Sequence, residues 1–195
     1  MTIYTMEVLG FVPATVAMRL SFNSQSSSQG IVESKGIYIN KDDHTLLLKL
    51  IRNGDSHAKI TRMIQCYLDI TAPRYWYQEF DTYKVGTVAM SGSTVHTLAN
   101  RDLTEDDFEG GMDGDILCKL NDTRSLIRVY DKNNVMYAMK HILPESFLQR
   151  RIVNLNYQVL RHIYLDRKGH RLPEWKIFID AIDTLPFPEF IKEER

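Results

Sequence analysis

Residues 54–96 read GDSHAKITRMIQCYLDITAPRYWYQEFDTYKVGTVAMSGSTVH. Residues 60–70 alternate, with one exception, between apolar and polar side chains, and this period of two predicts a half-buried strand. Pro73 favours the first turn of a helix, because its missing N–H would have no partner there in any case. The helix that follows would carry one aromatic side, formed by Trp76, Tyr77 and Phe80. The first part of this stretch therefore predicts a strand and a short helix.

A second strand and a polar turn complete the stretch. Residues 85–90 are apolar and rich in β-branched side chains, which predicts a strand, and residues 91–94 form a hydroxyl-rich turn, Ser-Gly-Ser-Thr. A strand, a helix and a strand would bring His57, Lys84 and these hydroxyl groups into one neighbourhood. A lone histidine near the start of a strand is more often packed or solvated than functional, so His57 by itself carries no assignment.

The composition indicates one globular domain, residues 1–195, with ordinary hydrophobic (44%) and charged (25%) fractions. The formal net charge is −1 and there is no basic block, so we expect no duplex nucleic acid as a partner. A small phosphorylated ligand needs only two or three local cations and stays open. No apolar run is long enough to cross a bilayer, and no secretory signal is evident, so we expect no membrane partner. Cys66 and Cys118 lie far apart and predict reduced thiols in a cytoplasm.

Periodicity predicts further elements along the chain. Asp42 or Asp43 is expected to cap a helix that ends at Gly54, and the polar serine run 23–29 predicts a mobile surface loop. The other predicted elements are a strand at 1–11, a helix from Pro13 carrying Val16, Ala17 and Leu20, and helices at 116–130 and 137–143. Four aspartates between 106 and 115 miss the spacing of a calcium loop, so no metal site is expected. The resulting fold class is α/β (α+β type), with a small mixed or antiparallel sheet flanked by helices.

The second informative stretch is residues 143–185. Residues 151–155 predict a strand and residues 156–167 a helix, on which Asn156 and Arg167 are eleven residues apart and therefore lie on one line. Leu160 and Ile163 form an apolar strip between them. A guanidinium at the end of such a face suits a planar or phosphate-bearing partner. The alternative is a structural arginine paired with Glu174 or Asp180. Trp175, in the helix expected after Pro173, is interpreted as a core residue.

The order of these parts resembles the flavin-dependent thymidylate synthases, whose second strand carries Arg-His-Arg-x-x-Ser-x-Asn-Glu-x-Ser-x-Arg. If Lys84 takes the third position, Thr87 falls on the first serine, but Ala89 and Met90 replace the Asn-Glu pair. If Ser93 takes the second serine, Ser91 replaces the glutamate and Lys84 the histidine. Neither frame keeps the arginines. The run Tyr-Trp-x-x-Glu-Phe-Asp-Thr-Tyr-Lys-Val-Gly-Thr is closer to a shorter, divergent branch associated with phage genomes.

The C-terminal half resembles the same family more closely. Its pattern Asn-x-Arg-x-Leu-x-His/Asn-Phe-x-x-x-Arg matches at Asn156, Leu160, His162 and Arg167, whereas Gln158 replaces an arginine. The resemblance implies FAD and methylenetetrahydrofolate as cofactors, deoxyuridylate (dUMP) as the nucleotide, and a homotetramer in a bacterial or phage-infected cytoplasm. The cofactor-binding residues that it implies are His57, Asn156 and His162. The substrate-binding residues would be Arg167, Lys84, Thr87, Ser91 and Ser93.

Two hypotheses follow from these residues. In the first, the chain is a flavoenzyme that binds a deoxyuridine nucleotide and modifies its C5 position, by methyl transfer with reduced flavin and folate. In the second, it is a catalytically inactive relative that binds a nucleotide or another protein, as a phage accessory or anti-defence module. No side chain is assigned as catalytic, because the family reaction needs no cysteine nucleophile and the charged signature is degraded.

Overall fold

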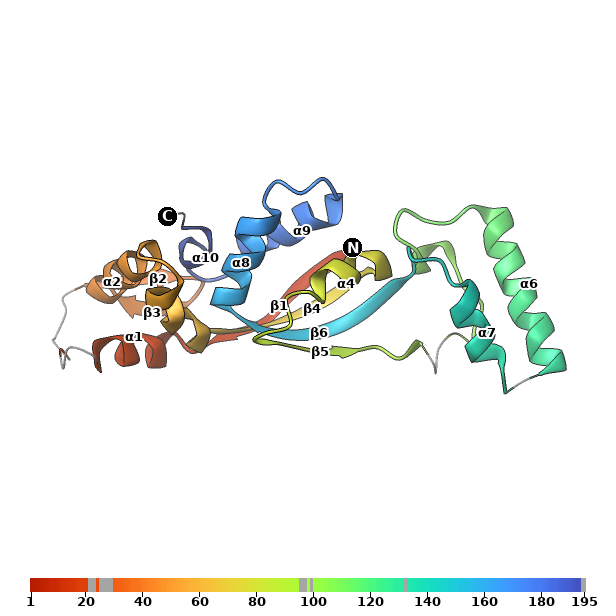
Figure 1. The fold of residues 1–195 in the computed structure, drawn as a ribbon, viewed down its shortest axis with the longest axis horizontal. Coiled ribbons are helices and arrows are strands. Elements are labelled where there is room, and N and C mark those ends of the chain that lie inside the picture. The colour runs from red at the N-terminus through yellow and green to blue at the C-terminus, as the bar shows by residue number, and fades with distance from the viewer. Residues whose placement is uncertain (21–23, 25–29, 95–97, 99, 132, 194–195) are drawn as a thin grey trace. The chain divides into compact units, whose positions relative to one another are not determined.

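The computed structural model describes the whole chain except residues 21–23, 25–29, 95–97, 99, 132 and 194–195. The elements are numbered in chain order, and Figure 1 labels most of them. The strands are β1 (Thr2–Leu9), β2 (Ile31–Ser34), β3 (Ile37–Asn40), β4 (Gln65–Pro73), β5 (Thr87–Ser91) and β6 (Leu148–Asn156). The helices are α1 (Phe11–Leu20), α2 (Lys41–Arg52), α3 (Asp55–Ala58), η1 (Lys59–Met63), α4 (Arg74–Phe80), η2 (Glu105–Asp107), α6 (Gly114–Tyr130), α7 (Val135–Ile142), α8 (Tyr157–Arg167), α9 (Pro173–Ile182) and α10 (Glu189–Lys192).

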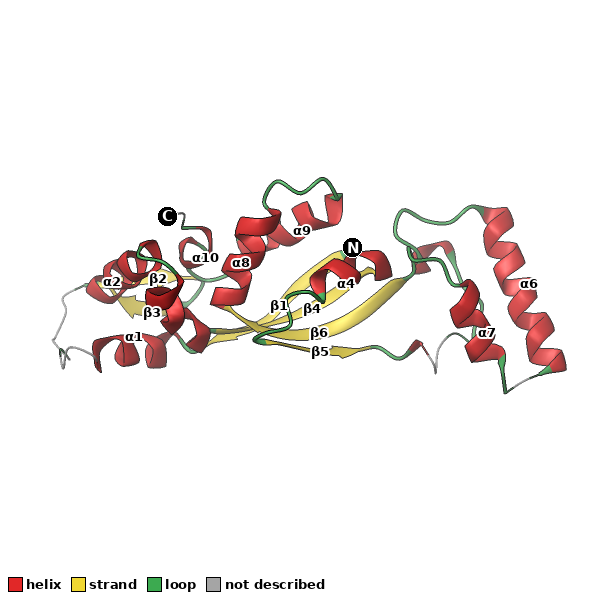
Figure 2. Ribbon diagram, viewed as in Figure 1, coloured by secondary structure: helices red, strands yellow, loops and turns green. Residues whose placement is uncertain are grey.

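Four strands form the main sheet in the order β1-β4-β6-β5 (Figure 2). The strands β2 and β3 form a separate antiparallel hairpin, which the sequence analysis did not predict. Its turn is Lys35-Gly36, where both residues have positive φ, 51° and 77°, the backbone that a two-residue hairpin needs. The expected α/β class, a small sheet flanked by helices, is confirmed.

The contacts divide the chain into two compact units, each assembled from separate stretches. The first unit comprises Met1–Thr2, Ile70–Thr82 and Met90–Arg151, and the second comprises Ile3–Asp69, Tyr83–Ala89 and Ile152–Arg195. Neither unit is a continuous piece of the sequence, so no linker marks a domain boundary. The single domain expected for residues 1–195 stays a prediction.

In the second unit, β4 shows the alternation expected for a half-buried strand. Cys66 and Leu68 are buried, whereas Tyr67 between them is 36% exposed. The expected start of this strand at residue 60 is wrong, because residues 59–63 form the 3-10 helix η1. Thr61 bonds locally: its Oγ1 donates to the carbonyl of Ala58 over 2.7 Å, which offers the backbone an alternative to the ladder.

Helix α8 forms the centre of the second unit. Leu160 and Ile163 are fully buried, as the apolar strip predicted. Arg161 is 1% exposed and donates to the backbone carbonyls of Ile191 and Glu193, so it satisfies carbonyl groups at the end of α10. The helix is thereby fixed along most of its length, which makes it a rigid support for its polar ends.

Two expected helix details in the second unit need correction. The N-cap of α2 is Asn40, whose side chain accepts from the N–H of Asp42, and not Asp42 or Asp43, which occupy the first turn. Helix α1 begins at Phe11, before Pro13, and its buried side includes Ala14 and Met18. Val16 and Leu20, which were expected to define that helix, are 54% and 61% exposed. The predicted loop at 23–29 lies almost entirely outside the described residues.

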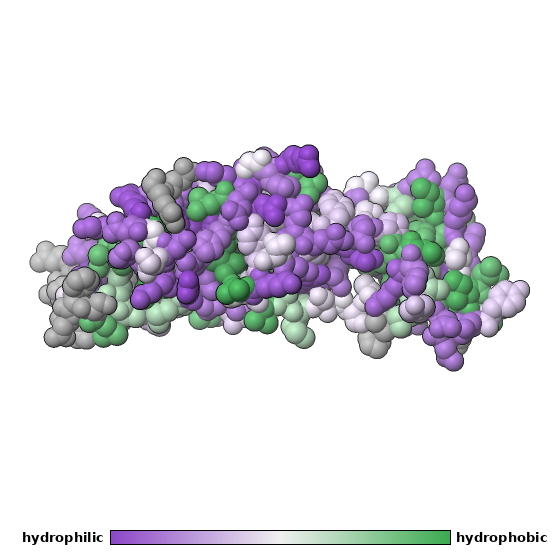
Figure 3. Space-filling model, in the orientation of Figure 1, coloured by the Kyte–Doolittle hydropathy of each residue, from purple (hydrophilic) through white to green (hydrophobic). Residues whose placement is uncertain are grey.

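The first unit has an aromatic core and a helical hairpin. Trp76, Tyr77 and Phe80 of α4 are all at most 1% exposed, which confirms the predicted aromatic side. Helices α6 and α7 pack around a cluster of buried hydrophobic residues, Leu98, Leu103, Phe108, Leu120, Val135, Met139, Leu143 and Phe147. Hydrophobic side chains also reach the surface over these two helices (Figure 3), among them Val129 and Tyr130.

Candidate functional site

Arg167, at the last position of α8, is held between aromatic side chains of the second unit. Its Nε donates to the hydroxyl of Tyr83 over 3.0 Å, and its guanidinium carbon lies 4.8 Å from the ring centre of Trp175. Cation–π contact stabilises a guanidinium in this position. Trp175 itself is fully buried, as expected for a core residue. Arg167 is half-buried and oriented, which suits a residue that meets a planar or anionic ligand.

Tyr83 links this arginine to the predicted substrate-binding lysine. The Tyr83 hydroxyl donates to Oδ2 of Asp166 over 3.1 Å while it accepts from Arg167. Burial raises the pKa of Tyr83 above its ordinary value of 10, and the neighbouring Arg167 opposes that shift. The hydroxyl therefore stays protonated at neutral pH. Because Lys84 follows Tyr83 directly, the structure brings Arg167 and Lys84 into one neighbourhood, although the role of each stays a prediction.

The loop before β5 packs against the start of α8. Gly86 has a φ of 82°, and a Cβ at this position would lie 2.7 Å from Nδ2 of Asn156. Only glycine fits without a shift of its neighbours. Thr87 follows, half-buried, and its Oγ1 is buried without a hydrogen-bond partner in the described part of the chain. Lys84 is exposed beside this contact.

The predicted cofactor-binding residues lie on α3 and α8. Asn156 is 8% exposed, and its Oδ1 accepts from the N–H of Val159 over 3.1 Å, so it is the N-cap of α8. His162 Nε2 lies 3.7 Å from Oδ2 of Asp55, two residues before His57. This contact connects α3, which carries His57, to α8. The flavin contacts of these three residues stay a prediction.

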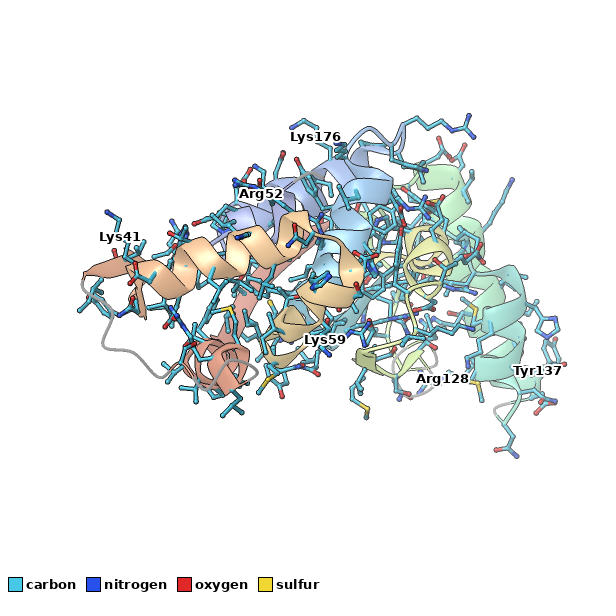
Figure 4. The ribbon with its side chains drawn as sticks, turned by 60° about the vertical axis from the view of Figure 1, so that its left-hand side comes forward. Lys41, Arg52, Lys59, Arg128, Tyr137 and Lys176 are labelled. Atoms are coloured by element: carbon cyan, nitrogen blue, oxygen red, sulfur yellow. The ribbon has the colours of Figure 1, made fainter. Side chains whose placement is uncertain are left out.

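A cavity of about 360 Å³ adjoins His57. Its polar lining consists of Ser56, His57 and Lys59, the last of which is labelled in Figure 4. Its apolar lining comes from α1, α2 and η1, at Ala17, Met18, Leu50 and Ile60. A lining that is largely apolar, with a few polar groups, is the composition of a small-molecule site.

The hydroxyl turn lies in the first unit, next to a cation that the sequence analysis missed. The N–H of Gly92 donates to the carbonyl of Arg150 over 2.8 Å, and Nε2 of Gln149 donates to the carbonyl of Gly92 over 3.2 Å. Ser91, Ser93 and Arg150 are all exposed there. The consecutive arginines 150 and 151, at the start of the predicted strand 151–155, were the signal that could have drawn attention to Arg150. Ser91 and Ser93 belong to the first unit, whereas Arg167, Lys84 and Thr87 belong to the second.

Gln158, the departure from the family pattern, has an arginine as its partner. Nε of Arg62, on η1, donates to Oε1 of Gln158 over 2.6 Å. Gln158 is 2% exposed, whereas Arg62 is exposed. Arg62 was not predicted as a functional residue, because it interrupts the alternation of residues 60–70 and no spacing rule connects it with α8.

The chemistry that the structure leaves open is limited. Burial raises the pKa of Cys66 from 9.0 to about 12, so this thiol is not a nucleophile at neutral pH, and Cys118 is exposed on α6. Among the described residues, no group of three His, Cys, Asp or Glu side chains is arranged to hold a metal ion. Within the same residues, no helix combines the length and the apolar character needed to cross a membrane.

Comparison with solved structures identifies the fold. The flavin-dependent thymidylate synthase of Helicobacter pylori, solved with FAD and dUMP, matches with a TM-score of 0.76 over 99% of this chain and 98% of that chain. The chain has the fold of the flavin-dependent thymidylate synthases. The sequence identity is 18%, and a second Helicobacter pylori structure, also with FAD and dUMP, matches with a TM-score of 0.74 at 15% identity over 99% and 100% of the two chains.

The fold of the flavin-dependent thymidylate synthases was predicted from motifs in this sequence, although the sequence comparisons find no match. No family model matches the sequence, and no curated protein matches it either. The likeness therefore rests on the arrangement of the elements, from β1 to the C-terminal helices, and it confirms the predicted resemblance at the level of the fold.

Proposed function

We propose that the chain binds a deoxyuridine nucleotide such as dUMP together with FAD, and that it modifies C5 of the nucleotide with reduced flavin and methylenetetrahydrofolate. The observation that carries the proposal is Arg167, oriented by Tyr83 and Trp175 at the end of a rigid α8. The fold supports it, because the Helicobacter pylori enzyme with this fold was solved with FAD and dUMP.

The nucleotide would be held by charge and by hydrogen-bond donors. Arg167 can bind a planar or anionic group with two parallel hydrogen bonds, and Lys84 adds a second positive charge in the same neighbourhood. Thr87 brings a buried hydroxyl without a described partner. Ser91 and Ser93, the other residues proposed for the phosphate from the family resemblance, lie on either side of Gly92 in the first unit.

The flavin would contact His57, Asn156 and His162. The residues present fit such a group: the lining of the cavity beside His57 combines apolar side chains with polar ones, and Asp55 connects the short helix of His57 to His162. When bound, reduced flavin supplies the hydride and the folate supplies the methylene carbon. The protein's own contribution is to orient two planar rings and to hold the nucleotide in place. The pKa of about 12 for Cys66 leaves this thiol protonated, which agrees with a reaction that uses no cysteine nucleophile.

A nucleotide-binding or protein-interaction module without catalysis is the second candidate. It is favoured by the β5 signature, in which the exposed Ala89 and Met90 occupy positions of the Asn-Glu pair in one frame. These side chains cannot polarise a ligand. Such a module would retain Arg167 and Lys84 for nucleotide binding, in a phage accessory or anti-defence role.

A homotetramer in a bacterial or phage-infected cytoplasm completes the proposal. Strand β1 exposes Tyr4 (65%) and Met6 (58%), and β5 exposes Val88 (63%), which supports an apolar surface covered by further copies. Cys66 and Cys118 are free thiols, as in a reducing compartment. Light scattering on the eluting protein would measure a mass of four chains; a mass of one chain would contradict the assembly.

Two measurements test the function. Flavin absorbance of the purified protein, alone and after addition of FAD, tests cofactor binding, and the rise in Tm on addition of dUMP tests nucleotide binding. Arg167→Ala is expected to lose the dUMP response and to keep its Tm, whereas Arg128→Ala, an exposed arginine on α6 (labelled in Figure 4), keeps both. A dUMP response without flavin would favour the non-catalytic module. No response to either ligand would refute the nucleotide proposal.

A further inference from the structure

Arg62 is an exposed arginine that a buried amide holds in place. Its Nε donates over 2.6 Å to Oε1 of Gln158, which is 2% exposed in the first turn of α8. A long side chain at the surface loses rotamer freedom when it is fixed, so the contact has an entropic cost. The hydrogen bond engages Nε and leaves the two terminal nitrogens of the guanidinium without a partner among the described residues.

The charge of Arg62 is not compensated by a carboxylate in the described part of the chain. Other arginines of the second unit show the contrast: Arg19 pairs with Asp43 at 2.7 Å, and Arg52 pairs with Glu193 at 2.5 Å. Those side chains complete ion pairs within the fold. Arg62 is instead oriented by a neutral group, which fixes its direction and preserves its full positive charge.

Lys84 is a second exposed cation, on the loop that packs against the start of α8. Gly86 packs against Asn156 and Val159, and Lys84, two residues earlier, is exposed and has no carboxylate partner among the described residues. The N-terminal end of α8 adds its own positive partial charge. The first turn of this helix therefore combines its own positive end with one uncompensated, pre-oriented cation, Arg62, and the loop that carries Lys84 packs against the residue that caps it.

We propose that Arg62, oriented by Gln158, is a phosphate-binding residue whose two terminal nitrogens take the oxygens of a phosphate group, with Lys84 as the second cation. A planar guanidinium fixed through Nε presents the edge that binds phosphate in a bidentate manner. The inference deepens the proposed function, because the phosphate would belong to one of its ligands, the nucleotide or the flavin dinucleotide.

Binding titrations with paired ligands test this role and identify the source of the phosphate. Wild type, Arg62→Ala and Arg128→Ala are each titrated with dUMP and deoxyuridine, with FAD and riboflavin, and with inorganic pyrophosphate. Arg128 is the matched control, because it is also exposed and without a described carboxylate partner, but no buried amide fixes it. Arg62→Ala should weaken binding of pyrophosphate and of one phosphorylated ligand about ten- to a hundredfold. It should leave deoxyuridine and riboflavin unchanged.

The outcomes separate this inference from the proposed function. If dUMP and FAD bind but Arg62→Ala changes none of the titrations, Arg62 is not a phosphate ligand and the proposed function stands. If wild type binds pyrophosphate through Arg62 but neither dUMP nor FAD, the inference stands and the proposed function fails. An equal loss for phosphorylated and unphosphorylated ligands would overturn the phosphate assignment.

Two further variants test the orientation by Gln158. Gln158→Glu keeps the size and the contact to Nε but places a negative charge beside the guanidinium, so phosphate affinity should fall as in Arg62→Ala. Arg62→Lys keeps the charge but loses the planar guanidinium with its two terminal nitrogens, so the phosphate affinity should fall several-fold. Thermal unfolding establishes whether each variant is folded. If Gln158→Glu does not fold, the test rests on Arg62→Lys. Wild-type affinity in either folded variant would contradict the role of the held guanidinium.

Discussion

Two arginine–tyrosine contacts in this chain differ in their surroundings. In the first unit, the guanidinium carbon of Arg151 lies 3.7 Å from the ring centre of Tyr77, and its Nη1 donates to Asp81 over 2.8 Å. In the second unit, Nε of Arg167 donates to the hydroxyl of Tyr83. Tyr77 is 1% exposed and its hydroxyl lies within hydrogen-bond distance of the carbonyls of Ile70 and Gln149, which share its single proton. Tyr83 is half-buried and its hydroxyl donates to an exposed aspartate.

The difference separates a structural contact from a candidate functional one. Arg151 covers a core tyrosine and is completed by a carboxylate, so its interactions hold the fold. Arg167 is oriented by aromatic side chains near the surface, an arrangement that positions a guanidinium for a ligand. The variants below test whether the first contact acts on stability and the second on binding.

The largest effect is expected from Tyr77→Ala. It removes a buried ring and the hydrogen bond that its hydroxyl shares between two backbone carbonyls, and should lower the free energy of unfolding by about 3–5 kcal/mol. Tyr83→Ala, the matched change in the other contact, should cost about 1 kcal/mol because that ring is partly solvated. Denaturant unfolding curves measure both. Equal losses would show that the Tyr83 contact is as structural as the Tyr77 contact.

The two arginines should show the clearest difference between an effect on binding and an effect on stability. Arg167→Ala should weaken dUMP about ten- to a hundredfold with little change in Tm, because it removes charge-assisted hydrogen bonds to the ligand. Arg151→Ala should lower the free energy of unfolding by about 1–2 kcal/mol, a value reduced because Asp81 is half exposed. Calorimetric titration and denaturant unfolding measure the two quantities on each variant. An Arg167→Ala protein that unfolds instead would establish a structural arginine.

Most of the fold was predictable because its signals are local. The period of two in residues 65–70, the aromatic side of α4 and the apolar strip of α8 all follow from burial of one face. The predictions that failed did so where a local hydrogen bond competes with the expected structure. The Thr61 hydroxyl bonds to Ala58 within η1, where β4 was expected to start, and Asn40 caps α2 in place of Asp42 or Asp43. The β2–β3 hairpin was missed because Lys35 in a left-handed conformation has no strong sequence signal.

The site was predictable only in part, since its contacts are long-range. The position of Arg167 on α8 follows from helical spacing, and Lys84 was expected beside it. Nothing in the sequence connects Tyr83 with Arg167, 84 residues later, or Arg62 with Gln158, 96 residues later. Such pairs depend on how the elements pack. The flavin and nucleotide roles came from the family resemblance, and they stay predictions here.

A smaller effect is expected from Tyr83→Phe, which removes only the hydroxyl. Arg167 would lose the acceptor of its Nε while it keeps the contact to Trp175, so dUMP affinity should fall about three- to tenfold, the equivalent of roughly 1 kcal/mol. Asp166→Asn is the control, because it keeps an acceptor for the Tyr83 hydroxyl and should change the affinity less. Titration of wild type, Tyr83→Phe and Asp166→Asn with dUMP measures these affinities. Wild-type affinity in Tyr83→Phe would mean that the Tyr83 hydroxyl does not orient Arg167 for the ligand.

The smallest effect concerns pH. Burial raises the pKa of Tyr83 above 10, so its hydroxyl is protonated in the folded protein throughout the range from pH 7 to pH 9. A tyrosine pKa raised by folding contributes stability that is present below the unfolded value of about 10 and is lost as the pH rises through the folded value. The difference in the free energy of unfolding between wild type and Tyr83→Phe should therefore be constant from pH 7 to pH 9 and shift against wild type above pH 10. Urea unfolding at each pH measures it. A difference that titrates near pH 8 would mean that Arg167 lowers the pKa of Tyr83 more than burial raises it, and that a tyrosinate–arginine pair holds the site.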